Sequence, residues 1–496
     1  MRVLIANRGE IAVRLARACR ELGWEAVAVY SEADGDKPHL RAAHWAVPLG
    51  PASPEASYLN VPRLLEVAQQ LGCQAVHPGY GFLAESPAFA RAVQDAGLLW
   101  IGPAPETIEL LGAKTEAREL ATRLGVPTVP GTEPLEHPDQ AREFARQVGY
   151  PILLKAVGGG GGKGMRVVRG EGELEESFRR AQEEGRAFFA DPRVYAEKLI
   201  EKPRHVEVQI LADRYGHVVH LGERECSLQR RHQKLLEEAP SVAVTPTLRA
   251  QLGEAAVAMA KASGYTTAGT VEFLLAEDGH FFFLEVNTRL QVEHPVTETV
   301  YGVDLAQWMM RLAGGEKLTL RQEELVPRGH AVEARIVAED PAQGFAPSPG
   351  RVILLREPAG PGVRVDSGIL EGCQVTLDYD PLLAKLIVWG ATRQEALARL
   401  RRALGEYVIL GVATNLPLFQ NLVEHPDFLA GKVHTGWLET NLAGLLGAPE
   451  PLAAAVAAAL EVGGLGLGSL DPYRNVEELK AWREAGRRAL LRGNGP

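Results

Sequence analysis

The chain has 496 residues, of which 46% are hydrophobic and 23% charged, and its 53 Lys and Arg residues against 63 Asp and Glu residues leave a formal net charge of −10. At about 150 residues per domain this length predicts roughly three domains, and the composition is that of an ordinary folded protein. Wholly disordered, collagen-like and coiled-coil chains are excluded, and the negative charge argues against a general binder of nucleic acid or of anionic membranes.

Cysteine usage and the N-terminus give expectations about location. The cysteines Cys19, Cys73, Cys226 and Cys373 lie far apart, so they form neither a CxxC metal pair nor a dense disulfide framework. No apolar run reaches the roughly 18 residues that a membrane-spanning helix needs, and the N-terminus meets charge too early for a signal peptide. We therefore expect a protein of the reducing cytoplasm.

The first hundred residues alternate between strand and helix patterns. Strands are expected at 3–6, 26–30, 75–77 and 98–101, and helices at 11–22, 61–71 and 89–96. Such alternation predicts an N-terminal parallel sheet covered by helices.

The pattern changes after Gly102-Pro103, and the fold class becomes α/β and α+β multidomain. The expected segments are a helix at 114–128, an α+β stretch at 135–200 around a glycine run, a strand-rich region at 203–301 with an Ala-rich helix at 247–263, and a second α+β segment at 331–445. The tail from about 447 is rich in Ala, Leu and Gly and then turns charged and helical from Asn475 to Leu491.

The glycine run lies between two predicted strands. Strand 151–157 leads into Gly158–Gly164, which carries five consecutive glycines, and a second strand follows at 165–169. A dinucleotide fingerprint would open into a helix, and a P-loop would have Ser or Thr after Gly-Lys, so both are excluded. Free backbone N–H groups beside Lys155 predict a lid over phosphate oxygens. The alternative is a flexible surface turn.

A predicted hairpin brings two acidic residues together. Asp278-Gly279 is typical of a two-residue turn, and that turn places Glu272 directly opposite Glu285, with Asn287 two residues further on the same face. Like charges in opposing positions destabilise a sheet. A divalent cation such as Mg²⁺ or Mn²⁺ would relieve the repulsion, whereas the alternative is two solvated carboxylates.

Three further places concentrate polar chemistry. Asn287–Pro295 includes Arg289, which can hold a planar oxyanion, and Glu293, which can act as a general base if its surroundings raise its pKa. The segment 223–234 is dense in charges, although alone it reads as a solvated stretch. Arg335 stands in an apolar strand, which is unusual unless the arginine is paired or functional.

Together these segments resemble biotin carboxylase, the ATP-grasp component of biotin-dependent acetyl-CoA and propionyl-CoA carboxylases. The resemblance runs from residue 1 to about 445 and rests on the ordered motifs Ala6–Ala12, His77–Leu83, Lys155–Arg166, Pro203–Glu207, Glu223–Lys234 and Glu285–His294. It implies an N-terminal domain at 1–113, an ATP-grasp domain at 114–330 with its lid at about 131–202, a C-terminal domain at 331–446 and a helical tail at 447–496.

The resemblance also implies site residues. ATP would contact Lys114, Lys155, Gly161, Gly162, Glu197, Lys198, Leu199, Ile200, His205, Gln229 and His232. Glu272, Glu285 and Asn287 match the ligands of two Mg²⁺ or Mn²⁺ ions. Lys234, Arg289, Gln291 and Val292 match the bicarbonate pocket, Glu293 matches the base, and Arg335 faces biotin.

The implied reaction is ATP- and bicarbonate-dependent carboxylation of biotin. Glu293 deprotonates bicarbonate, which attacks the γ-phosphate of ATP to give carboxyphosphate and ADP. Carboxyphosphate then releases CO₂ and phosphate, and the phosphate removes the ureido N–H proton of biotin. Arg335 stabilises the enolate-like oxygen while biotin N1 attacks CO₂.

The implied partners are a biotin carboxyl carrier protein, carboxyltransferase subunits and a second copy of this chain. Because no Ala-Met-Lys-Met-type hairpin occurs, and Ala258–Lys261 falls in a predicted helix, we expect biotin on a separate carrier. The tail either docks a partner or is a dispensable extension. The alternatives for the whole chain are another ATP-grasp ligase that joins a carboxylate to an amine, and a non-catalytic nucleotide-binding subunit.

Overall fold

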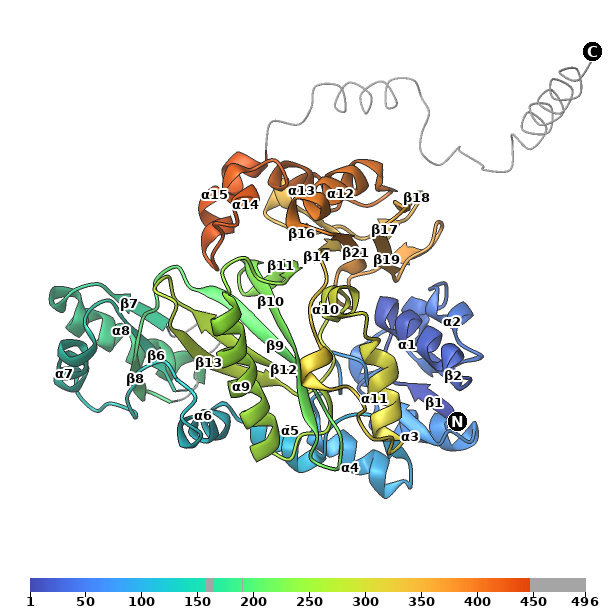
Figure 1. Cartoon of the computed structure of the whole chain (residues 1–496), viewed down its shortest axis with the longest axis horizontal. Helices are drawn as coiled ribbons and strands as arrows, with labels where there is room; N and C mark the ends of the chain where they lie inside the picture. The colour runs from blue at the N-terminus through green and yellow to red at the C-terminus, as the bar shows by residue number, and fades with distance from the viewer. Residues whose placement is uncertain (158–164, 190, 447–496) are drawn as a thin grey trace, which may run out of the picture. The chain divides into compact units, whose positions relative to one another are not determined.

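The first hundred residues, drawn in blue in Figure 1, form a parallel sheet. Its five strands lie in the order β3-β2-β1-β4-β5. Its strands are β1 (Arg2–Ile5), β2 (Glu25–Ser31), β3 (Trp45–Gly50), β4 (Ala75–His77) and β5 (Leu99–Trp100). The helices of this part are α1 (Gly9–Glu21), α2 (His39–Ala42), α3 (Val61–Gln70), α4 (Pro87–Asp95) and α5 (Pro105–Gly112). Val3 and Ile5 pack with the α1 side, and Leu4 packs with α3 and α4, so both faces are covered. The predicted parallel sheet is confirmed.

The computed structural model describes residues 1–157, 165–189 and 191–446, and these residues belong to a single unit. The glycine run that we interpreted as a lid, and the tail from 447 with its predicted helix, lie outside the described residues. Within the described residues, no helix combines the length and apolar character that crossing a membrane would require.

A small α+β body follows α6 (Lys114–Arg123) and lies at the left of Figure 1. It is a three-stranded sheet in the order β7-β6-β8 with two helices. The elements are α7 (Pro138–Val148), β6 (Ile152–Ala156), β7 (Met165–Val168), α8 (Glu171–Phe189) and β8 (Val194–Lys198). Phe144, Leu154 and Phe178 belong to a hydrophobic cluster confined to this body. Strands 151–157 and 165–169 are thus present close to their predicted positions.

The helix predicted at 114–128 is shorter than expected. α6 ends at Arg123, because Gly125 adopts a left-handed φ of +71° and the chain then turns. Thr128 forms a bridge with Phe283, so residues after the turn line the edge of a strand instead of continuing the helix. The helix α5 had no counterpart in the sequence interpretation.

An eight-stranded antiparallel sheet forms the centre of the described chain, in the order β13-β12-β9-β10-β11-β14-β21-β19. Its strands are β9 (Arg204–Ala212), β10 (Val218–Arg230), β11 (Gln233–Ala239), β12 (Thr267–Leu275), β13 (Phe281–Asn287), β14 (His330–Val337), β19 (Val363–Ser367) and β21 (Leu382–Gly390). The expected domain boundary at 330/331 falls where β14 begins, and β14 pairs with β11. The sheet therefore passes through that boundary without a break, and the division into domains stays a prediction.

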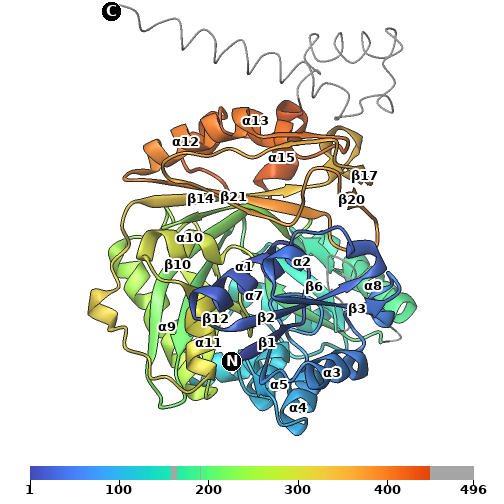
Figure 2. The same cartoon turned by 90° about the vertical axis from the view of Figure 1, so that its right-hand side faces the viewer.

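Helices cover the two faces of this sheet. They are α9 (Pro246–Ala262), α10 (His294–Tyr301), α11 (Leu305–Ala313), α12 (Arg393–Glu406), α13 (Leu416–Leu422), α14 (Pro426–Leu429) and α15 (Trp437–Leu445). Figure 2 shows α12 and α13 above β14 and β21, with α10 on the other side. Along β14, Val332 and Ala334 join the core under α12, whereas Ala331 packs with α10. Residues Glu333 and Arg335 share the α10 face, since strand side chains alternate.

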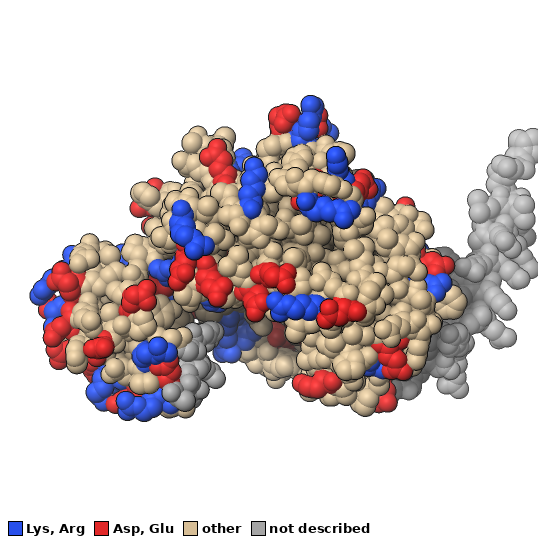
Figure 3. Space-filling model, turned by 90° about the horizontal axis from the view of Figure 1, so that it is seen from below, with Lys and Arg blue, Asp and Glu red and all other residues tan. Residues whose placement is uncertain are grey.

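Charged side chains of both signs are interleaved on the face shown in Figure 3. The net negative charge of the chain is therefore not gathered into a single acidic field on that face. The cavity described below is lined by residues of the N-terminal part, the smaller body and the central sheet.

Candidate active site

The hairpin of β12 and β13 places Glu272 opposite Glu285, as predicted, although the turn differs from the prediction. Ala276 pairs with His280 across a three-residue loop, so the register starts one residue off the predicted one. A β-bulge at Leu284 then inserts one residue and restores the predicted pairing at Glu285. The two carboxylates face each other because the bulge compensates for the longer loop.

Basic side chains surround these two carboxylates. Glu272 is buried, and its carboxylate lies 2.8 Å from both His205 Nε2 and Lys234 Nζ. Asn287 Nδ2 donates to Glu272 Oε1 at 2.8 Å, and Lys114 Nζ lies 3.3 Å from Glu285 Oε2. Burial would raise the pKa of Glu272, but Lys234 and His205 hold it well below its ordinary value. Two opposed carboxylates with a neighbouring amide form an all-oxygen donor set that suits Mg²⁺ or Mn²⁺.

Lys234 on β11 joins three acidic residues at one point. Its Nζ lies 2.5 Å from Glu207, 2.8 Å from Glu272 and 2.7 Å from Glu293. Burial alone would lower the pKa of Lys234, but these carboxylates raise it well above its ordinary value. Arg224, which is fully buried, supports the cluster through Glu207 at 2.5 Å. Residues 223–229 are therefore a buried charged strand, not the solvated stretch that the composition suggests, whereas residues 231–233 at the following turn are exposed.

Glu293 is fully buried beside the cavity and ion-paired at both carboxylate oxygens. Oε1 accepts from Lys234, and Oε2 accepts from Arg335 at 2.9 Å. Burial would raise its pKa, but Lys234 and Arg335 hold the pKa well below its ordinary value. The condition attached to Glu293 in the sequence interpretation, a raised pKa, is not met in this state. Glu293 is ionised at neutral pH and weakly basic, because two cations share its charge.

Arg289 donates to three side chains and to the backbone carbonyl of Leu290. Its Nε donates to Glu85 at 2.8 Å, and its terminal nitrogens donate to Gln291 Oε1 at 3.0 Å and to Asn287 Oδ1 at 3.1 Å. The guanidinium therefore lies next to the acidic hairpin, and Glu85 reaches it from the N-terminal part of the chain. This position suits a group that holds an anion beside a metal site.

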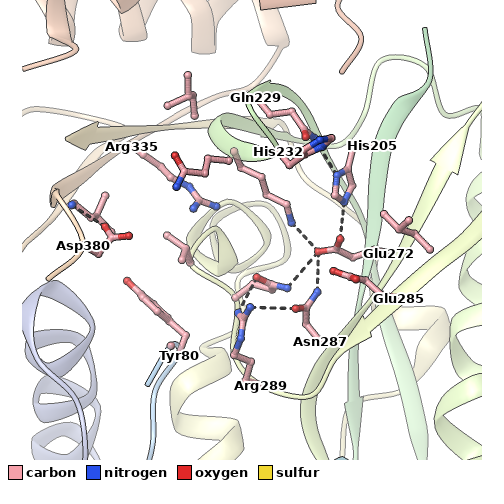
Figure 4. A pocket seen from close by; sticks show the side chains of 18 of the residues that line it. Tyr80, His205, Gln229, His232, Glu272, Glu285, Asn287, Arg289, Arg335 and Asp380 are labelled. Carbon is pink, nitrogen blue, oxygen red and sulfur yellow. Dashed lines mark hydrogen bonds and ion pairs between the residues drawn. The ribbon is translucent and has the colours of Figure 1, made fainter. Parts of the chain in front are cut away.

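A cavity of about 1260 Å³ collects most of the predicted site residues. The predicted residues that line it are Lys114, Lys155, Glu197, Lys198, Leu199, Ile200, His205, Gln229, His232, Lys234, Glu272, Glu285, Asn287, Arg289, Gln291, Val292 and Arg335. Figure 4 shows Glu272, Glu285, Asn287 and Arg289 grouped in this pocket, with Arg335 across from them. Glu293 is packed behind the lining. Gly161 and Gly162 lie outside the described residues.

Local backbone geometry presents His232 to the cavity. Arg231 and His232 form the two-residue turn between β10 and β11, and both have positive φ, +48° and +67°. Non-glycine residues rarely adopt this conformation, and such strain is typical of functional sites.

Within the smaller body, Lys155 Nζ contacts Glu197, which also accepts a hydrogen bond from Arg118 at 2.7 Å.

Sequence reasoning missed several residues that shape this site. Tyr80 lines the cavity, and its motif was noted without a role for the residue. Glu237 accepts from Arg335 Nε at 2.6 Å, and Lys385 is fully buried behind Val292. The signal that singled out Arg335, a charge within an apolar strand, also holds for Lys385 and would have found it.

The chain matches three protein-family models. "Biotin carboxylase, N-terminal domain" covers residues 1–108, "Carbamoyl-phosphate synthase L chain, ATP binding domain" covers 113–321, and "Biotin carboxylase C-terminal domain" covers 333–440. The chain belongs to the biotin carboxylase family. Biotin carboxylases are ATP-dependent carboxylating ligases, so the predicted enzyme class and the resemblance are confirmed.

Individual relatives agree with this assignment. The chain is 50% identical to "Biotin carboxylase 1" of Bacillus subtilis over 441 residues, which cover 88% of this chain and 98% of the relative. It is 49% identical over 439 residues to a pyruvate carboxylase subunit of Methanothermobacter thermautotrophicus, covering 88% of this chain and 89% of the relative. The 2-oxoglutarate carboxylase biotin carboxylase domain dimer of Hydrogenobacter thermophilus, solved with MgADP, ADP and bicarbonate, is similar with a TM-score of 0.83 and 46% identity, and the match covers 90% of this chain and 99% of that one.

Proposed function

We propose that this chain carboxylates biotin with ATP and bicarbonate through a carboxyphosphate intermediate, and that the site residues act in the roles assigned below. One observation carries the proposal: a single cavity joins the Glu272–Glu285 hairpin to the Lys234–Glu293–Arg335 cluster. A phosphoryl donor and a small carboxylating centre would therefore meet in one cavity. The relative solved with MgADP and bicarbonate supports these ligands.

The hairpin end of the cavity would receive the triphosphate of ATP. Glu272, Glu285 and Asn287 would hold Mg²⁺ or Mn²⁺, and the metal when bound would offset negative charge on the transferred phosphoryl group. Lys114, now beside Glu285 at 3.3 Å, and Lys155 would turn to phosphate oxygens. Glu197–Ile200, His205, Gln229 and His232 would surround the nucleotide.

The bicarbonate site would lie between Arg289 and Lys234, with Gln291 and Val292 along its wall. Glu293 would accept the bicarbonate proton, and the carbonate oxygen would attack the γ-phosphorus as ADP leaves. A bound bicarbonate anion would compete with Glu293 for the positive charge of Lys234. The Glu293 carboxylate would then be less stabilised in its ionised form and so more basic. This offers a way for a carboxylate of low pKa to act as the base.

Arg335 would stabilise the oxygen of deprotonated biotin. Its guanidinium is fixed by Glu237 and Glu293, so it would present donors without reorganising when charge develops. Phosphate released from carboxyphosphate with CO₂ would take the ureido N–H proton. Biotin N1 would then attack CO₂ and form carboxybiotin.

We further propose a carrier protein and carboxyltransferase subunits as partners, a homodimer, and acetyl-CoA or propionyl-CoA as the final acceptor. The dimer named for the Hydrogenobacter relative supports the proposed homodimer. Relatives named for pyruvate and 2-oxoglutarate make those acids the competing acceptors. The acceptor is a property of the carboxyltransferase and not of the cavity described above.

The decisive experiment measures ADP release and ¹⁴C-carboxybiotin with free biotin and with a biotinylated carrier. Carboxybiotin formation that requires both ATP and bicarbonate supports the proposal, and cleavage of ATP that does not depend on bicarbonate, or ADP release that never yields carboxybiotin, contradicts it. An ATP-grasp ligase of the alternative kind would need an amine instead of biotin. Identification of copurifying subunits, followed by carboxylation of the four candidate acceptors, tests the partners and the acceptor.

A further inference from the structure

A row of charged side chains crosses the sheet beneath the segment Gln291–Glu293. Glu237 on β11 lies opposite Glu333 on β14, and Arg335 on β14 lies opposite Lys385 on β21. All four stand on the face covered by α10. Two pairs of like charges in opposing positions are unfavourable, and Lys385 is fully buried. An apolar residue of similar volume would avoid the desolvation of this ammonium group.

The Lys385 ammonium group points at one backbone atom of the site. Its Nζ donates to the carbonyl oxygen of Val292 at 2.8 Å. Val292 stands between Gln291, which lines the cavity, and Glu293, which pairs with Lys234 and Arg335. Because the peptide unit is planar, a fixed Val292 carbonyl fixes the plane that joins Val292 to Glu293. That plane sets the backbone from which the Glu293 side chain departs, and it restrains Gln291 through the single residue between them.

The charge of Lys385 is balanced from a distant part of the chain. Glu10, in the first turn of α1, lies 3.2 Å from Nζ, and Asp366 lies 3.9 Å away. Asp366 already pairs with Arg364 at 2.7 Å, so it does not require Lys385 for charge balance. Glu10 also accepts from the Tyr80 hydroxyl, and Tyr80 lines the cavity. Lys385 thus ties the N-terminal part to the bicarbonate segment.

We propose that Lys385 is a positioning residue that holds the Val292 carbonyl and thereby sets the geometry in which Gln291 and Glu293 meet bicarbonate, with Glu10 as the counter-ion that keeps Lys385 charged and in place. The inference rests on the proposed function, because it concerns the bicarbonate end of that site. Lys385 touches no substrate in this assignment. Its effect is on bicarbonate and not on the nucleotide, since its ion pairs and hydrogen bonds within the described residues include none of those assigned to ATP.

The test replaces Lys385 in the full-length chain by Met, which keeps most of the side-chain length and removes the donor. In biotin-dependent ADP release, Lys385→Met is expected to raise the bicarbonate KM about 10- to 100-fold, the range found for second-layer partners of reactive groups. The ATP KM should stay within about twofold. Lys385→Gln, which retains an N–H donor of shorter reach, should recover part of the bicarbonate affinity.

Arg393→Met is the matched control. Arg393 also pairs with a buried carboxylate, Glu238 at 2.7 Å, and donates to the backbone carbonyls of Leu429 and Phe428, but it lies outside the cavity. It should lower the melting temperature without moving the bicarbonate KM. If it moves that KM as much as Lys385→Met does, the effect of Lys385 is only general destabilisation and the inference fails.

The double variant Lys385→Met/Glu10→Gln removes the unpaired carboxylate that the single change leaves behind. An unchanged bicarbonate KM in folded Lys385→Met or in the double variant overturns the inference while the proposed function stands. Loss of folding in all three Lys385 variants also overturns it, because Lys385 would then be a residue of the fold. If the wild-type chain shows no bicarbonate-dependent cleavage, the proposed function fails first and takes the inference with it.

Discussion

Replacing Arg335 by Ala gives the sharpest test of the proposed biotin step. The structure places its Nε 2.6 Å from Glu237 and one terminal nitrogen 2.9 Å from Glu293, and both carboxylates are fully buried. Breaking a buried ion pair from one side costs about 3–5 kcal/mol of stability. Part of this cost is relieved, because burial already raises the pKa of Glu237 to about 7 and the carboxyl group can take up a proton.

The loss of Arg335 should also lower the rate of biotin carboxylation, independently of its effect on stability. Loss of one pre-positioned donor to a developing oxyanion lowers turnover about 100- to 1,000-fold. We therefore expect Arg335→Ala to reduce carboxybiotin formation by this factor. ATP affinity should be nearly normal, because the residues assigned to the nucleotide, such as Lys155 and His205, have no contact with Arg335 among the ion pairs and hydrogen bonds of the described residues.

The assay compares ¹⁴C-carboxybiotin formation, nucleotide binding by calorimetry and urea unfolding for wild type, Arg335→Ala and Arg393→Ala. Arg393→Ala removes a comparable buried ion pair with Glu238 and should lose stability alone. Arg335→Ala with intact carboxylation, or with ATP affinity lowered more than about tenfold, would refute the assignment of Arg335 to biotin.

Three further predictions concern the metal, acid stability and chain packing. Glu285→Gln should raise the Mg²⁺ concentration for half-maximal activity about tenfold or more, and an unchanged titration would count against the hairpin as the metal site. Burial alone would raise the pKa of Glu238, but His330 and Arg393 help to hold that pKa at about 2. The contribution of the ionised Glu238 carboxylate to folding stability is therefore complete above pH 4.5 and is lost as the pH falls toward 2. Glu238→Gln should thus lower the unfolding free energy by about 3 kcal/mol at pH 7 and by about half of that at pH 3, whereas an equal loss at both values would contradict this pairing. A Cβ at Gly368 would lie 2.8 Å from the backbone nitrogen of Glu10, so Gly368→Ala should destabilise the fold by about 1–3 kcal/mol, and an unchanged melting temperature would show that the two segments are not so close.

In the β12–β13 hairpin a local sequence rule gave the right pairing although one of its assumptions was wrong. The Asp278-Gly279 signal correctly predicted antiparallel strands and opposed carboxylates, because side-chain alternation and hairpin pairing are local. It could not reveal the three-residue loop or the bulge at Leu284, since bulges depend on packing against neighbouring strands. The longer loop shifted the strand register by one residue and the bulge shifted it back, so Glu272 and Glu285 are still paired.

The protonation of Glu293 depends on residues that are distant in the sequence. Its position in a polar segment marked it as a candidate base, but its pKa depends on Lys234 and Arg335, which are 59 and 42 residues away in the chain. Only the sheet that pairs β11 with β14 brings these two cations to one carboxylate. Electrostatic energy depends on distance and burial, and neither can be read from sequence spacing.

The sequence by itself determined the alternating N-terminal sheet, the order of the motifs and the residue types at most of the cavity wall, because periodicity and turn chemistry act over a few residues. The tertiary structure alone decided that one antiparallel sheet runs through the expected boundary at 330/331, that residues 223–229 are buried, and that Glu10, Lys385 and Val292 meet. These contacts join positions as far apart as Glu10 and Lys385, where only the packing of complete elements selects the neighbours.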